Sequence, residues 1–246
     1  AGFVLRQESA REGTQDGPQR TAAYLSDPQY YSPERAYYSS AHAAGSPAGG
    51  LPRMRYLLDC TLSKLARWLR IMGVDAALET SAEERRRTSN RPHVFILFDR
   101  CRAERRTLVT TSYKLILRRE CPPGAYLVDP RRDATDTLAR LLIAHGASVE
   151  PSRFLTVCTA CNGAIAEVAD PHDREELHRT KQAPNEPGLN VYACKDCGQC
   201  YWWSGNPDSS AARVKKKATE LLAACARAGV PAEGPLDIFA HVDVAA

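Results

Sequence analysis

Short apolar runs alternate with amphipathic segments over residues 53–146. The runs MRYLLD and GAYLVD end in Asp59 and Asp129, and the run RTLVTT is followed directly by Ser112. Strands that alternate with helical segments predict an α/β fold built on a doubly wound parallel sheet. In such a sheet the functional crevice lies at the carboxyl ends of the strands, where these three residues fall.

The segment CTLSKLARWLRIMG, residues 60–73, predicts an amphipathic helix that ends at Gly73. One face of this helix is apolar: Leu62, Leu65, Ala66 and Leu69. The opposite face is basic and is expected to be exposed: Lys64, Arg67 and Arg70. If the protein binds RNA, these three cations are the first candidates for phosphate contacts, although a plain solvated helix face has the same pattern.

Three further segments complete the pattern of elements. SYKLILRRE (112–120) and DATDTLARLLIAHG (133–146) predict helices, and VFILFD (94–99) fits either a strand or the start of a helix. In the segment 133–146 the residues that share one side are Leu138, Leu141, Leu142 and His145. A last helix is expected within 209–229. The runs Arg85–Arg87 and Lys215–Lys217 are secondary candidates for RNA contacts, with the same alternative of a solvated surface.

Composition divides the chain into four parts. Residues 1–52 lack hydrophobic periodicity and predict an extended interaction tail. The stretch DPQYYSPERAYYSS in this tail carries four tyrosines, which suit a partner interface but could also pack on the tail's own domain. We expect the sheet domain at 53–153, a cysteine-containing module at 154–208, and a C-terminal helix and tail at 209–246.

Charge is distributed unevenly along the 246 residues. Residues 53–153 carry 20 basic and 12 acidic residues, whereas the whole chain has a net charge of only +4. A basic domain is the electrostatic footprint of a nucleic-acid partner, although a solvated arginine-rich surface would look the same. No apolar run approaches the roughly 18 residues of a membrane span, so we expect no membrane partner.

Four of the nine cysteines form two CxxC pairs: Cys158, Cys161, Cys194 and Cys197. Two CxxC turns can close a tetrahedral Zn²⁺ site with no open position, which predicts a structural zinc rather than a catalytic one. A glycine follows each pair and suits the turn. The other five cysteines are expected to pack as small apolar residues: Cys60, Cys101, Cys121, Cys200 and Cys225. The aromatic run 201–203 could stack on bases, but packing beside the metal is the favoured interpretation.

These motifs together resemble the C-terminal RNase domain of the mutator-seven exonuclease family. LLDCTLSKLARWLRIMGVD is similar to the opening motif of that family, and CTACNG with CGQCYWWSG is similar to its zinc ribbon. The resemblance covers residues 55–205. It implies a PIN-like domain, similar to PIN nucleases, followed by a small zinc ribbon with four cysteine ligands. It also implies an RNase that holds Mg²⁺ or Mn²⁺ on carboxylates at strand ends.

The carboxylate set that the resemblance implies is incomplete in this chain. Asp59 matches the first acid of the family, although it could equally cap the helix that follows. The Thr-Arg-Asp motif of the family reads Thr110-Thr111-Ser112 here, and a serine hydroxyl is a weak ligand for a hard cation. We therefore expect Asp59, Ser112 and Asp129 to be vestigial. Other acids could stand in for the missing ones: Glu83, Glu84, Asp99, Asp133 and Asp136.

Our preferred hypothesis is a non-catalytic RNA- and protein-binding component or assembly factor of a ribonucleoprotein particle such as a mitochondrial ribosome. The RNA would then be ribosomal, and zinc would be the resident cofactor. The alternatives are an active metal-dependent RNase that uses Mg²⁺ or Mn²⁺, and a zinc-ribbon adaptor that contacts only protein. The first residue, Ala1, is compatible with removal of a targeting sequence, so we expect a mitochondrial location, or otherwise a cytoplasmic one.

Overall fold

The computed structural model describes residues 54–89, 95–186, 188–202 and 210–234. The chain divides into two units, Ala1–Ala36 and Tyr37–Ala246, and every described residue belongs to the second. The predicted interaction tail, residues 1–52, lies outside the described residues. Within the described ranges, no helix has both the length and the apolar character needed to cross a membrane.

A four-stranded sheet forms the centre of the first domain. All neighbouring strands are parallel, and their spatial order is β2-β1-β3-β4. The strands are β1 (Arg55–Leu58), β2 (Asp75–Leu78), β3 (Thr107–Thr110) and β4 (Tyr126–Leu127). The sequence pattern predicted β1, β3 and β4. It missed β2, whose residues DAAL are too short and too small to form a recognisable apolar run.

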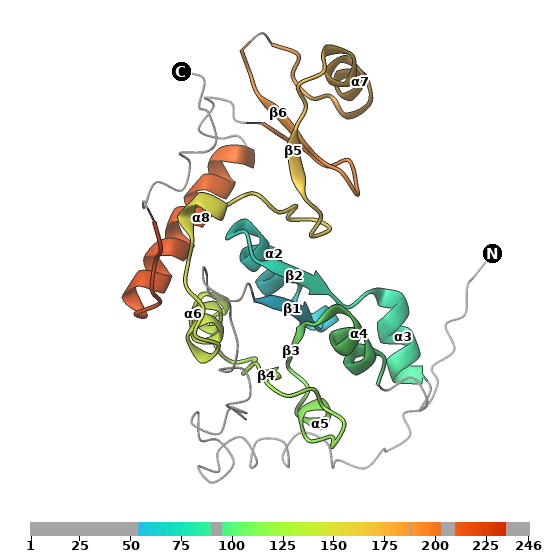
Figure 1. Cartoon of the computed structure of the whole chain (residues 1–246), viewed down its shortest axis with the longest axis vertical. Helices are drawn as coiled ribbons and strands as arrows, with labels where there is room; N and C mark the ends of the chain where they lie inside the picture. The colour runs from blue at the N-terminus through green and yellow to red at the C-terminus, as the bar shows by residue number, and fades with distance from the viewer. Residues whose placement is uncertain (1–53, 90–94, 187, 203–209, 235–246) are drawn as a thin grey trace, which may run out of the picture. The chain divides into compact units, whose positions relative to one another are not determined.

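Alternate residues of β1 enter two different apolar cores. Tyr56 and Leu58 pack with α2, α6 and α8 on one face, whereas Leu57 packs with α4 and α5 on the other. This alternation follows from the period-two geometry of a strand. Figure 1 shows helices on both sides of the sheet. The prediction of an α/β, doubly wound parallel sheet followed by a small cysteine-rich ribbon is therefore confirmed.

The helices of this domain follow the predicted segments, with one addition. Their bounds are η3 (Cys60–Leu62), α2 (Ser63–Ile71), α3 (Ser81–Ser89), α4 (Ile96–Glu104), α5 (Tyr113–Ile116) and α6 (Ala134–Ala144). The ambiguous segment 94–99 leads into α4, so Asp99 lies in the first turn of a helix and not at a strand end. The additional helix is α3, which is almost entirely polar and so carries no apolar periodicity.

The helix α2 ends where the sequence predicted, and packing explains why Gly73 stands there. Gly73 has φ 73°, in the left-handed region that favours glycine. A Cβ at this position would also lie 2.1 Å from the backbone oxygen of Arg153. The chain of the short helix η5 (Pro151–Arg153) therefore crosses directly against the end of α2.

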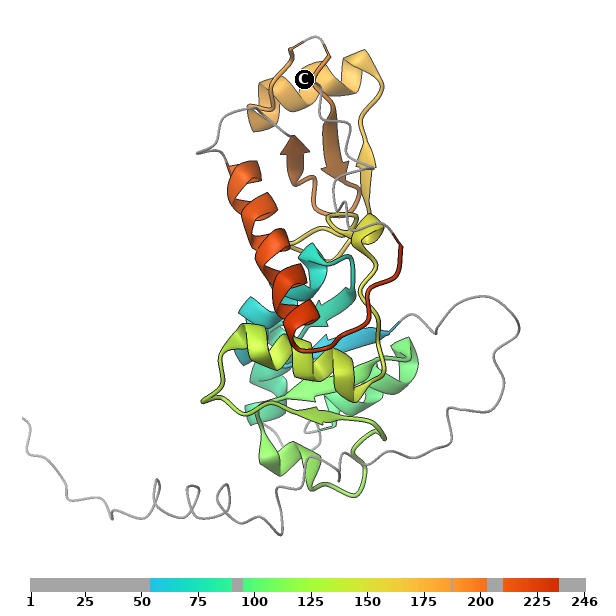
Figure 2. The same cartoon turned by 90° about the vertical axis from the view of Figure 1, so that its left-hand side faces the viewer.

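The last helix, α8 (Ser210–Arg227), packs against the sheet domain rather than standing apart. It contacts α2 and α6, and its residues Ala218, Leu221 and Cys225 belong to the same apolar core as Tyr56. Figure 2 shows α8 alongside α2. The whole ribbon and most of the sheet domain separate these two helices along the chain, so only the folded structure brings them together.

The ribbon is a three-stranded antiparallel sheet in the order β5-β6-β7. Its strands are β5 (Ile165–Glu167), β6 (Val191–Cys194) and β7 (Cys200–Trp202). The helix α7 (Pro171–Lys181) lies in the connection between β5 and β6 and contains no buried residue. The ribbon has only a small apolar core of its own, built around Ala183, Val191 and Cys200, so its order depends on other interactions.

Candidate functional site

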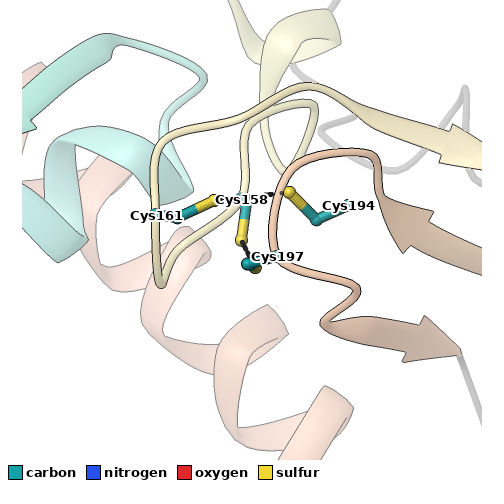
Figure 3. A group of neighbouring side chains, drawn as sticks. All are labelled: Cys158, Cys161, Cys194 and Cys197. Carbon is teal, nitrogen blue, oxygen red and sulfur yellow. Dashed lines mark hydrogen bonds between the residues drawn. The ribbon is translucent and has the colours of Figure 1, made fainter.

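The four cysteines of the CxxC pairs come together at one end of the ribbon. Their Sγ atoms all lie within 4.8 Å of one another, and the separations are 3.7 Å for Cys158–Cys197 and 3.4 Å for Cys161–Cys194. Figure 3 shows the sulfur atoms turned towards one another between two loops. A tetrahedral Zn²⁺ ion with Zn–S bonds of about 2.3 Å places its sulfur ligands about 3.8 Å apart. The cluster therefore fits zinc and leaves no open coordination position.

Tight backbone turns make this cluster possible. A Cβ at Gly163 would lie 2.3 Å from Oδ2 of Asp196 and 2.9 Å from Sγ of Cys194, so only glycine lets the two loops approach this closely. Gly198 adopts φ 67° in the second turn. The predicted need for a glycine after each pair is thus confirmed, but for two different reasons.

Hydrogen bonds around the cluster prepare one thiol for metal binding. Burial raises the pKa of Cys158, but hydrogen bonds from Tyr201 and from backbone amides outweigh it and lower the pKa to about 7. The Tyr201 hydroxyl lies 3.0 Å from Cys158 Sγ and accepts a hydrogen bond from Thr159 N. Burial and hydrogen bonds with neighbouring thiols raise the pKa of Cys161 to about 12. Four thiolates so close together therefore need a cation to be stable.

The aromatic run after the second CxxC pair is used in packing, as favoured from the sequence. Tyr201 is half-buried against the first cysteine loop, and Trp202 packs on the small ribbon core. Trp203 lies outside the described residues. Cys200 also packs in this core, and Cys101 and Cys225 are buried in the first domain. Cys60 and Cys121 are only partly buried, so the expectation that they are small buried residues holds only in part.

The first cysteine loop is anchored to the edge strand β2 of the parallel sheet. Asn162 accepts a hydrogen bond from Ala76 N through Oδ1, at 2.7 Å, and donates through Nδ2 to Asp75 Oδ1, at 2.6 Å. Asp75 is also paired with Arg55 and Arg106. The loop therefore satisfies part of the open edge of the sheet, which would otherwise be available for pairing with another strand.

The prediction that Arg70 lies on the exposed face of its helix is wrong. Arg70 is only 5 % exposed, because the cysteine loop covers it. Its Nε donates to Ala76 O at 2.8 Å, and one Nη donates to the carbonyls of Thr159 and Ala160, at 3.1 and 2.8 Å. Burial lowers the pKa of Arg70, and the nearby Cys158 and Cys161 partly offset that effect. Arg70 thus joins the sheet domain to the zinc-type cluster and is not available to RNA.

At the carboxyl edge of the sheet, Asp59 is already saturated with hydrogen bonds. It is 3 % exposed. Oδ1 accepts from Thr61 N at 3.0 Å and from the Thr61 hydroxyl, and Oδ2 accepts from Thr110 Oγ1 at 2.6 Å and Thr111 N at 2.7 Å. It also caps the helix η3, which was one of the two roles considered from the sequence. A carboxylate in this state has little capacity left for a metal ion.

A second acid at this edge, Glu79, was missed by the sequence analysis. It directly follows β2, and its side chain is fully buried. Cys60 N donates to Oε2 at 3.2 Å, while Arg87 forms a two-point ion pair with both oxygens at 2.6 and 3.0 Å. The only sequence signal was an acid after a short apolar tetrapeptide, and that signal was too weak to recognise.

Arg87, a second basic candidate for RNA contacts, is also less accessible than the sequence suggested. Its side chain is 16 % exposed and is held against Glu79, so it does not belong to a free basic run. The ion pair with Glu79 raises the pKa of Arg87, with smaller contributions from Cys60 and Asp59. A permanent protein cation thus sits beside the two acids at the ends of β1 and β2, where the resemblance would place a metal ion.

The other vestigial positions add little metal-binding capacity. Ser112 precedes α5 without capping it through its side chain. Asp129 Oδ1 accepts from Arg131 N at 3.0 Å, and Oδ2 lies 3.6 Å from Arg132 Nε. Most of the proposed stand-in acids are also paired: Glu83 with Arg100, Asp99 with Arg102, Asp136 with Arg140, and Asp133 with the backbone of Thr135. Burial is the main cause that raises the pKa of the Cys60 thiol, and the nearby Glu84 adds to that effect.

Among the described residues, the cysteine cluster is the one group of three or more metal-type side chains whose ligand atoms converge. The carboxylates at the sheet edge do not form such a group. Mg²⁺ and Mn²⁺ require several oxygen ligands that are free to coordinate. The four cysteines therefore fit a structural zinc, and no group of three or more converging carboxylates lies among the described residues.

The remaining basic candidates lie on the surface. Lys64 and Arg67 are exposed on α2, as predicted. On α8, Lys216 is exposed, whereas Lys215 and Lys217 are partly buried. Arg85 and Arg86 are exposed on α3.

Comparison with known proteins supports one assignment. The sequence model of the Mut7-C RNase domain matches residues 54–214. This range covers the parallel sheet, the ribbon and the start of α8. No curated protein and no solved structure matches the chain.

Proposed function

The chain belongs to the Mut7-C RNase domain family, and we propose that within this RNA-related family it acts as a non-catalytic RNA-binding protein. In this proposal the nuclease-like domain keeps its basic surface and its zinc ribbon but does not cleave RNA. It serves as a component or assembly factor of a ribonucleoprotein particle, in contact with both RNA and protein.

The state of the carboxylates at the sheet edge carries this proposal. Asp59 accepts four hydrogen bonds from its own chain, and Glu79 is paired with Arg87. Ser112 stands where the family motif has an acid. A nuclease metal would have to displace internal donors and a guanidinium before it could bind. This arrangement favours a stable, inactive edge over a catalytic one.

The zinc cluster has a structural role in this proposal. When bound, Zn²⁺ supplies a fixed tetrahedral junction between the two ribbon loops. Asn162 and Arg70 then carry that order to the sheet, because both bind the backbone of β2. The ribbon thus keeps the domain rigid without taking part in chemistry.

An RNA cleavage assay in Mn²⁺ tests the loss of activity. We expect the wild type to bind RNA and leave it intact. Cleavage by the wild type that is abolished in Asp59→Asn would contradict the proposal and establish an active RNase. Cleavage that persists in Asp59→Asn would come from a contaminant. Activity gained in Ser112→Asp would locate the loss at that position.

Salt dependence separates RNA binding from a purely protein-binding adaptor. Phosphate contacts make RNA affinity fall steeply with added salt, so a titration at several salt concentrations should give a clear negative slope. The particle itself is tested by sedimentation of a cell lysate with and without RNase treatment. The mitochondrial location and the ribosomal identity of the RNA stay predictions, and imaging of the tagged protein with sequencing of cross-linked RNA checks both.

A further inference from the structure

An exposed lysine of α2 and a partly buried lysine of α8 meet around one aromatic ring. Lys64 Nζ lies 4.8 Å from the ring centroid of Trp68, and Lys217 Nζ lies 4.9 Å from the same centroid. The two lysines are far apart in the sequence and come from helices that pack against each other. The ring therefore holds two ammonium groups in a shared place on the surface.

Several arginines of the sheet domain are already ion-paired and are therefore not comparable with this group. Arg55, Arg87, Arg100 and Arg106 each form ion pairs with acids of the same domain. By contrast, Lys64, Arg67 and Lys216 form no ion pair with any residue that the structure describes. Lys217 pairs with Glu220 one turn further along α8. Asp133 lies near Lys64, and Glu220 lies near Lys216 as well as Lys217. The four cations still outnumber these two acids, so the group has a net positive charge.

We infer that Lys64, Lys217 and the neighbouring Arg67 and Lys216 form a binding surface for the phosphate backbone of RNA. This inference rests on the proposed RNA-binding function and assigns that function to a place. It also replaces the group suggested by the sequence: Arg70 is excluded by burial, and Lys217 joins Lys64 through the packing of α8.

The chemistry of this surface favours phosphates over bases. Trp68 is only 8 % exposed, so its ring is not free to stack on a nucleotide base. Lysine ammonium groups act as point charges towards phosphate and do not read base edges. Contacts of this kind position a nucleic acid without selecting a sequence. We therefore expect this surface to bind RNA with little sequence preference.

The test compares charge-matched variants of the full chain. Affinity for a mixed-sequence single-stranded RNA is measured by fluorescence anisotropy at several salt concentrations. The double variant Lys64→Gln/Lys217→Gln should bind about tenfold more weakly, and the slope of log K against log salt should become shallower by about two. The control Arg119→Gln/Arg179→Gln removes two exposed charges, one from the turn after α5 and one from α7, and should bind like the wild type.

A variant that keeps both positive charges distinguishes a loss of charge from a folding defect. Lys64→Arg/Lys217→Arg should retain wild-type affinity. Failure of the wild type to bind RNA at low salt would sink the proposed function. Wild-type binding that the Gln variant retains would sink only the inference, and so would an equal loss in the control. Unchanged RNA affinity with lost sedimentation of the particle would assign the surface to a protein partner instead.

Discussion

The cysteine cluster of the ribbon and the acids at the carboxyl edge of the sheet both gather metal-type side chains. In the ribbon, four thiols face one another, and the guanidinium of Arg70 beside them donates to backbone carbonyls. At the sheet edge, the oxygens of Asp59 and Glu79 face backbone amides, hydroxyls and the guanidinium of Arg87. The difference teaches that the residue type alone does not make a metal site. The ligand atoms must also converge on one another, as the four sulfur atoms do.

Among the variants that test this comparison, loss of a cysteine ligand should have the largest effect on metal binding and stability. Cys194→Ser is expected to abolish zinc binding and to lower the melting temperature by about 10 °C or more, because zinc binding energy is folding energy for such a ribbon. Removal of zinc from the wild type with a chelator should give the same shift. Zinc content by mass spectrometry and a thermal melt check both expectations.

Cys200→Ser is the matched control for this prediction. Cys200 is a buried ribbon cysteine outside the cluster. We expect it to keep full zinc content and to lose only about 1 kcal/mol or slightly more of stability. Full zinc retention in Cys194→Ser would contradict the assignment of the four ligands.

Removal of the internal cation at the sheet edge should have the next largest effect. Arg87→Ala leaves the fully buried Glu79 carboxylate without its counter-charge, which should cost about 3–5 kcal/mol of unfolding free energy. Urea unfolding measures this change. The double variant Glu79→Gln/Arg87→Ala should recover part of the loss, because the buried charge is then removed as well. A loss below about 1 kcal/mol in the single variant would show that water or another cation replaces Arg87.

Loss of the hydrogen bonds made by Asp75, which help to join the cysteine loop to β2, should have a smaller, pH-dependent effect on the free energy of unfolding. Burial raises the pKa of Asp75, but hydrogen bonds from Arg106, Arg55 and Asn162 outweigh it and hold the pKa below its usual value. Since the folded pKa lies below the unfolded value of about 3.9, the stabilisation is fully present above that value and is lost as the pH falls through the folded pKa.

Asp75→Asn tests this dependence. The variant should be about 1–2 kcal/mol less stable than the wild type at pH 7, and the difference should shrink as the pH falls through the folded pKa of Asp75. Unfolding curves at a series of pH values check the expectation. A difference that does not change with pH would mean that Asp75 acts through packing and not through its charge.

The smallest effect is expected at an exposed ion pair of the same domain. Asp99 and Arg102 have side chains that are 73 % and 52 % exposed. Asp99→Asn should change the unfolding free energy by less than about 0.5 kcal/mol, because water screens such pairs. This variant sets the baseline for the buried pair of Glu79 and Arg87. A cost comparable to that of Arg87→Ala would remove the distinction between the two pairs.

Much of the fold was predictable because it depends on local patterns. The alternation of apolar runs with helical segments was enough to predict the parallel sheet, and the CxxC spacing was enough to predict the cysteine cluster. The strand β2 and the helix α3 were not predicted, because neither has a clear apolar period. Glu79 was missed for the same reason, since an acid is noticed at a strand end only when the strand is recognised.

By itself, the sequence determined the order of the elements, the four cysteine ligands, the absence of an acid at Ser112 and the position of Gly73 at the end of α2. Each of these depends on residue type and short-range spacing. Only the tertiary structure decided that Asp59 is saturated, that Arg87 neutralises Glu79, that Arg70 is buried under the cysteine loop, and that Lys217 lies beside Lys64. The physical reason is that each of these contacts joins separate elements of the fold, whereas periodicity and spacing report only on neighbours within one element.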